Sequence, residues 1–237
     1  MATAPKGAEL HADAEWIRLH RLAIGEFDFR LRQVLPEYWI ASTPCDEWDT
    51  SDLVRHVVVE TLIVAGVLAG RDPAVVRAEF TGFRSVVADP DMSDGVDGDD
   101  EEFGDDDFAR SILDHEPAED FIEGDMELVW EDAHRAAVAA FAEADLDGFV
   151  GDPAAGFRVI DYLRERTADI IVHAWDLADA VSVDDRLDLE VVVAVYEWAK
   201  PHEHRFAASP LKFDLPLQAE PGADLQQRLL ALFGREA

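Results

Sequence analysis

Residues 166–180 read RTADIIVHAWDLADA, and this stretch combines an apolar stripe with two side chains of the kind that bind metals. Asp169 and His173 are four residues apart, so on a helix they lie one turn apart on the same face. A carboxylate and an imidazole in that arrangement can bind one metal ion. Ordinary amphipathic helices often contain the same spacing, and there the pair only stabilises the helix.

The helix that contains this stretch is expected over residues 156–181. Its apolar positions alternate in steps of four and three, which is typical of the seam of a helical bundle; they are Leu163, Thr167, Ile170, Ala174, Leu177 and Val181. Asp169 and His173 are rotated by roughly 80–120° from the centre of this seam. We therefore expect both side chains at the edge of a cleft.

Three further helical segments precede this one or lead into it. Apolar residues recur at three- and four-residue steps over residues 13–35, where Pro36 ends the pattern, and over residues 126–141. A helix is also expected from Asp49, whose carboxylate can accept a hydrogen bond from the backbone near Asp52. It continues to Leu68 and is apolar on most sides, which predicts that it is the most buried element.

The chain after Ser182 is predicted to form a smaller unit. It contains helices over residues 187–198 and 225–233, with an extended or strand-like segment over residues 211–217. The sequence thus predicts a mainly α protein, a four-helix bundle over residues 1–182 with a small C-terminal α(+β) subdomain over residues 183–237.

The bundle is interrupted by an acidic stretch, about residues 88–120, which we expect to be a solvated loop. Closely spaced Asp and Glu residues repel one another and bury no apolar surface. The alternative is a calcium loop, because Asp89, Asp91 and Ser93 have the spacing of an EF-hand start. That reading is disfavoured by Asp94, because the sixth position of such a loop requires glycine.

Composition excludes several classes of partner. The chain has 20 basic and 52 acidic residues, a net charge of −32, which repels nucleic acids and anionic membrane surfaces. This acidity fits either a high-salt or a high-GC bacterial source. The N-terminus lacks the apolar run of a signal peptide, and residues 57–69 are too short to span a bilayer, so a cytoplasmic location is expected. A single cysteine, Cys45, excludes an intrachain disulfide.

Residues 43–56 read TPCDEWDTSDLVRH, and this second motif places His56 early in an apolar helix. Together with residues 169–178 and the closing segment over residues 225–235, it resembles the DinB-like helical bundles. The specific resemblance is to the mycothiol-dependent maleylpyruvate isomerase N-terminal domain family, with its Thr-Pro-Cys-x-x-Trp-x-x-x-Asp-Leu-x-x-His and acidic-x-x-x-His-x-Trp-Asp-Leu-Ala runs. The resemblance covers nearly the whole chain apart from the acidic stretch.

This resemblance implies a metal site formed by His56, Asp169 and His173. Two imidazoles and one carboxylate suit zinc first, or nickel or another first-row divalent ion, and leave positions for a further ligand. The family also implies a low-molecular-weight thiol, mycothiol or a relative, acting on a small electrophile in a transfer or isomerisation reaction. The best-known isomerases of the family have Glu where this chain has Asp169, so the metal site is implied more directly than the isomerase reaction.

Other side chains near the motifs have a functional and a structural reading. Trp48 and Trp175 either shape the pocket or pack in the core, while Asp176 either orients His173 or is a surface charge. Glu60, like Glu165, is either a reserve carboxylate or a solvated charge. Cys45 is either a reactive thiol or a small residue packed beneath Trp48.

Three functions are compatible with these residues. The first is a metal- and thiol-dependent transferase or isomerase with small-molecule partners. The second is a metal-binding bundle without turnover, acting in storage or stress response. In the third no metal is bound, Asp169 and His173 form a helix-stabilising pair, and the bundle binds an apolar ligand. The sequence leaves open whether the chain forms a homodimer.

Overall fold

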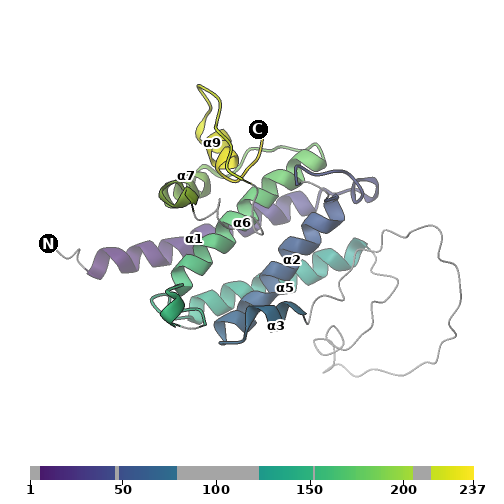
Figure 1. The fold of residues 1–237 in the computed structure, drawn as a ribbon. Coiled ribbons are helices and arrows are strands. Elements are labelled where there is room, and N and C mark those ends of the chain that lie inside the picture. The colour runs from purple at the N-terminus through teal and green to yellow at the C-terminus, as the bar shows by residue number, and fades with distance from the viewer. Residues whose placement is uncertain (1–5, 46–47, 79–122, 152, 205–214) are drawn as a thin grey trace, which may run out of the picture.

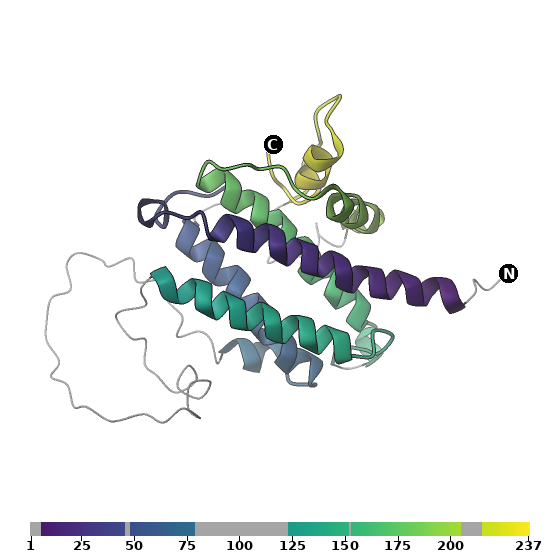
Figure 2. The ribbon, with the colours of Figure 1, turned by 180° about the vertical axis from the view of Figure 1, so that it is seen from behind.

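A computed structural model describes residues 6–45, 48–78, 123–151, 153–204 and 215–237. Four long helices form a bundle: α1 (Lys6–Leu31), α2 (Thr50–Leu68), α5 (Glu123–Glu143) and α6 (Val159–Ala180). Helix α1 packs against α6 and α2 against α5, while α2 also contacts α6 and α1 contacts α5 (Figures 1 and 2). The expected mainly helical class is confirmed. The described residues contain no strand, only two isolated β-bridges.

The shorter elements pack on the outside of this bundle. Helix α3 (Pro73–Ala78) lies on α2 at Gly66, where an added Cβ would come within 3.0 Å of Val76. Helices α7 (Leu189–Ala199) and α9 (Leu225–Leu232) contact each other, and α7 also packs on α6 and α1 (Figure 1). Three single 3₁₀ turns complete the described elements, η1 (Pro36–Tyr38), η2 (Pro153–Ala155) and η3 (Lys200–His202).

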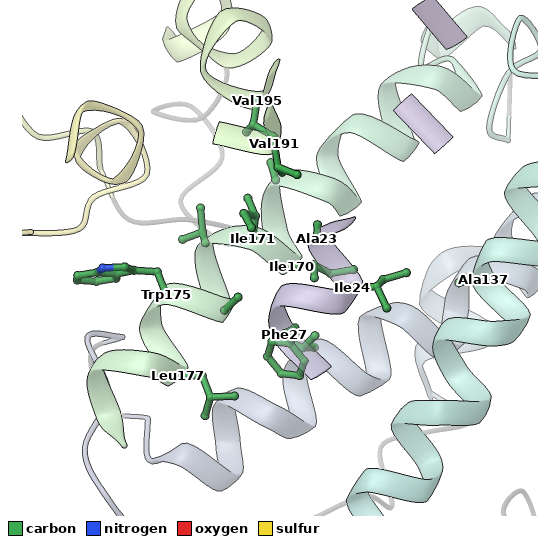
Figure 3. Packing of buried hydrophobic residues seen from close by; sticks show 14 of the residues in the cluster. Ala23, Ile24, Phe27, Ala137, Ile170, Ile171, Trp175, Leu177, Val191 and Val195 are labelled. Atoms are coloured by element: carbon green, nitrogen blue, oxygen red, sulfur yellow. The ribbon is translucent and has the colours of Figure 1, made fainter. Parts of the chain in front are cut away.

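The most buried helix is α6, so the prediction that α2 would be the most buried element was wrong. In α6, 17 of the 22 residues are buried, whereas in α2 nine of the 19 residues are buried. The reason is its position, because α1, α2 and α7 all pack against α6. Figure 3 shows Ala23, Ile24 and Phe27 of α1 gathered near Ile170 of α6 within this core.

Several helix boundaries follow from local chemistry. Helix α1 ends at Leu31, earlier than the predicted residue 35, because Pro36 holds Leu35 in an extended conformation (φ −81°, ψ 157°). Helix α2 begins after Asp49, as predicted, and the side chains of Asp49 and Asp52 form a capping box.

Two predicted segments lie wholly or partly outside the described residues. The acidic stretch over residues 88–120, with its calcium-loop alternative, lies wholly outside them. Of the extended segment over residues 211–217, residues 211–214 lie outside them. Residues 215–217 are irregular, and the N–H of Leu217 donates to the carbonyl of Ala231 at 2.7 Å. None of the helices within the described residues combines the length and the apolar character needed to cross a membrane.

The cap of α2 gives the first testable prediction, because this helix carries His56 in its second turn. Replacing Asp49 by alanine removes the acceptor of the Asp52 N–H (2.9 Å) and is expected to lower the free energy of unfolding by about 1 kcal/mol. Urea unfolding measures the effect. Asp49→Asn keeps an acceptor and should retain most of the stability; an Asp49→Ala protein as stable as the wild type would contradict the capping role.

Candidate metal centre

Helices α2 and α6 bring together the three side chains expected to bind a metal. The carboxylate Oδ1 of Asp169 lies 3.6 Å from Nε2 of His56 and 3.7 Å from Nε2 of His173. The two imidazole rings are 5.0 Å apart and nearly perpendicular, at 73°. One ligand atom from each residue therefore points to a common point, and all three atoms lie within 4.8 Å of one another.

This arrangement fits a divalent first-row ion. Ligand atoms about 2.0–2.2 Å from a tetrahedral zinc lie about 3.4 Å from each other, close to the two nitrogen–oxygen distances of this site. Neither Nε2 atom has a hydrogen-bond partner among the described residues, although both are buried. An unpaired buried polar atom costs about 1–3 kcal/mol. A cation at the common point would satisfy both nitrogens and the carboxylate together.

His173 is held in the required orientation by Asp176, three residues along α6. Its Nδ1 lies 2.9 Å from Oδ2 of Asp176. Burial alone would raise the pKa of Asp176, but the hydrogen bond with His173 and the charge of Arg235 lower that pKa below its ordinary value. Because Asp176 is therefore an ionised acceptor, His173 donates from Nδ1 and keeps the lone pair of Nε2 for a metal.

Asp169 is ionised, and its two carboxylate oxygens contact different partners. Burial would raise its pKa, but the guanidinium of Arg166 and the two nearby imidazoles hold the pKa well below its usual range. Arg166 contacts Oδ2 through Nη1 at 3.4 Å, which leaves Oδ1 facing the histidines. The same Nη1 donates to Oε2 of Glu60 at 2.8 Å. Glu60 is thus neither a solvated charge nor near enough to join the group of ligands.

The two tryptophans proposed near the site have different positions. The ring of Trp48 lies 4.9 Å from that of His56 and 6.0 Å from that of His173, so it forms one wall of the site. Trp175 is two residues beyond His173, about 200° around the helix, and its ring points away from Phe27 (Figure 3). Its position fits core packing.

Exposure differs around the triad. The side chain of His56 is 25 % exposed, whereas Asp169 and His173 are 3 % exposed each. The approach from solvent is therefore on the His56 side. Asp169 and His173 were expected at the edge of a cleft, and the structure instead buries them inside the bundle. The packing of α1, α2 and α7 against α6 explains the difference.

A second group of possible metal ligands shares His173 and consists of Cys45, His173 and Asp176. Burial and the nearby charge of Asp176 raise the pKa of the Cys45 thiol well above its usual range. The protonated thiol donates to Oδ2 of Asp176 at 3.3 Å. Both oxygens of Asp176 already accept from Arg235, at 2.8 and 3.0 Å. A cation here would face a buried guanidinium, so this group fits a metal poorly.

Two arginines of the site did not emerge from the sequence reasoning, Arg166 and Arg235. Arg166 had a visible signal, since it lies three residues before Asp169 and therefore on the same face of the helix. Arg235 is 59 residues from Asp176, so no local spacing links the two. Glu165, the other reserve carboxylate, belongs to neither group of candidate ligands among the described residues.

Comparison with known proteins supports the resemblance drawn from the motifs. Residues 20–178 match the family model described as the mycothiol maleylpyruvate isomerase N-terminal domain. The matched span contains His56, Asp169, His173 and Asp176, whereas Arg235 lies beyond it. No curated protein and no solved structure matches the chain.

Proposed function

The chain belongs to the mycothiol maleylpyruvate isomerase N-terminal domain family, and from this premise we propose that it is a metal- and thiol-dependent transferase or isomerase. In this proposal Nε2 of His56, Nε2 of His173 and Oδ1 of Asp169 hold one divalent ion, zinc first and nickel or another first-row ion next. The thiol is mycothiol or a related low-molecular-weight thiol, and its partner is a small electrophile. The convergence of two unpaired buried imidazole nitrogens on one carboxylate oxygen carries the proposal.

The balance of charge around the site favours an anionic thiol. Three carboxylates, those of Glu60, Asp169 and Asp176, are each paired with a guanidinium. Within the described residues these three pairs neutralise one another, and a divalent ion would add its positive charge to them. When bound, such an ion supplies a Lewis acid that lowers the pKa of a thiol close to it.

The residues of this chain would prepare the site for that chemistry. Asp176 fixes the tautomer of His173, and Arg166 holds the carboxylate of Asp169 in one orientation. Trp48 and the exposed edge of His56 lie where a small thiol would arrive from solvent. Cys45 is buried and its thiol donates to Asp176 at 3.3 Å, so it does not face a substrate that arrives from solvent.

The experiment that tests the proposal begins with protein purified without a chelator or a metal-affinity tag. We expect elemental analysis to find about one divalent ion per chain. We also expect the protein to consume electrophiles such as α,β-unsaturated acids or epoxides only when both the ion and mycothiol, or another small thiol, are present. Removing the ion with a chelator should stop turnover, and restoring zinc should recover it.

Other results would favour the competing functions. Bound metal without turnover across a broad panel of thiols and electrophiles would favour a metal-binding bundle that is not an enzyme. Protein that contains no divalent ion, and takes up none when zinc is added, would leave Asp169 and His173 as a helix-stabilising pair.

A further inference from the structure

A chain of ion pairs runs from the outside of the bundle to Asp169. Nη2 of Arg77, on α3, lies 2.6 Å from Oε1 of Glu60, on α2. Oε2 of Glu60 lies 2.8 Å from Nη1 of Arg166, on α6, and the same nitrogen is 3.4 Å from Oδ2 of Asp169. The last of these ion pairs is made by Oδ2 of Asp169, the oxygen that does not face the two histidines.

The distances show how Arg166 is shared. Its side chain is 6 % exposed, so its charge requires buried partners. Glu60 is the nearer partner by 0.6 Å, as the distances of 2.8 and 3.4 Å show. Glu60 therefore holds the guanidinium back from Asp169. A guanidinium free of Glu60 could pair with both oxygens of Asp169, because planar bidentate contact is the preferred geometry of an Arg–carboxylate pair.

We propose that Arg166 and Glu60 are positioning residues that make Asp169 a metal ligand through a single oxygen. Arg166 occupies Oδ2 and prevents the carboxylate from chelating an ion with both oxygens. Glu60 keeps Arg166 from pairing with Oδ1 of Asp169 as well, so that Oδ1 stays available to the ion. The inference rests on the proposed metal site and concerns how that site is tuned, since one-oxygen binding keeps a position free for the thiol.

Opposite changes are expected when the two residues are replaced. Arg166→Gln frees Oδ2, so Asp169 can bind a metal through both oxygens and the coordination number rises by one. Glu60 keeps Arg77 as a partner in this variant, at 2.6 Å. Glu60→Gln removes the charge that restrains Arg166, so the guanidinium competes for Asp169. We expect this variant to bind metal about 10- to 100-fold more weakly, the usual effect of changing a group that supports a ligand.

The test uses the full-length protein loaded with cobalt(II), whose visible absorption weakens as the coordination number rises. We expect a weaker band for Arg166→Gln, and for Glu60→Gln an unchanged band shape with a larger dissociation constant in a cobalt titration. A role limited to stability would lower the unfolding temperature and leave the spectrum unchanged. Arg135→Gln is the matched control, because this arginine forms exposed ion pairs on α5, with its side chain 63 % exposed.

The outcomes separate this inference from the proposed function. Wild-type protein that binds no cobalt overturns both. Wild-type protein that binds cobalt, with both variants matching it in spectrum and affinity, overturns only the roles of Arg166 and Glu60. If Arg166→Gln does not fold, Glu60→Gln decides the question alone: unchanged affinity rejects the inference and weaker binding supports it.

Discussion

Replacing His56 by alanine is expected to empty the candidate metal centre and abolish thiol-dependent turnover while leaving the helical fold intact. His56 supplies one of three proposed ligands, and two remaining ligands on one helix hold an ion far more weakly. The fold should tolerate the change, because the side chain is 25 % exposed and its Nε2 has no hydrogen-bond partner among the described residues. Elemental analysis and turnover of a thiol with an electrophile measure the two losses.

Thermal unfolding gives an independent measurement of the same variant. An ion that binds only the folded state stabilises it by about 4 kcal/mol at a concentration 1,000 times the dissociation constant. We expect added zinc to raise the unfolding temperature of the wild type and to have almost no effect on His56→Ala. His204→Ala is the control, because His204 is exposed and belongs to neither group of candidate ligands. A His56→Ala protein with unchanged metal content would reject the proposed triad.

The sequence predicted the helices better than the site. The period of the apolar residues located the helix of residues 156–181, and the capping chemistry of Asp49 fixed the start of α2. Local patterns of this kind depend on neighbours along the chain. The meeting of His56 with Asp169 depends instead on the stagger of α2 against α6, which periodicity does not set. The resemblance to a family supplied that pairing, and the structure places the two side chains 3.6 Å apart.

The depth of the site was the main feature that the sequence did not predict. Helical geometry places Asp169 and His173 beside the apolar seam, and from one helix alone they look like the edge of a cleft. Burial depends on what the neighbouring helices cover, and the apolar period of residues 187–198 does not show that α7 packs on α6 and α1. The contact between Arg235 and Asp176 is of the same kind, since tertiary packing alone brings these residues together.

The second large effect is expected at Asp176. Replacing Asp176 by alanine should lower the free energy of unfolding by about 3–5 kcal/mol, the usual cost of removing one partner of a buried ion pair. Asp176 is fully buried and Arg235 is 3 % exposed, so the buried guanidinium would lose this carboxylate. His173 would also lose the acceptor of its Nδ1 proton, and we expect metal affinity to fall about 10- to 100-fold.

Acid should remove the same stabilisation from the wild type. The folded-state pKa of Asp176 lies below its ordinary value, so its ionised form stabilises the fold fully above the ordinary carboxyl range. That contribution is lost as the pH falls through the lowered pKa. Urea unfolding at a series of pH values should therefore show the difference between the wild type and Asp176→Ala shrinking in acid.

A double variant tests whether the buried charge of Arg235 causes this loss of stability. Arg235→Met removes the guanidinium, so adding it to Asp176→Ala should restore part of the lost stability, because an apolar side chain needs no partner. Asp184→Ala is the control for an exposed pair with Arg186, and it should change stability by less than about 1 kcal/mol. If the double variant is no more stable than Asp176→Ala, the buried charge of Arg235 is not the cause. Asp176 would then act mainly through His173.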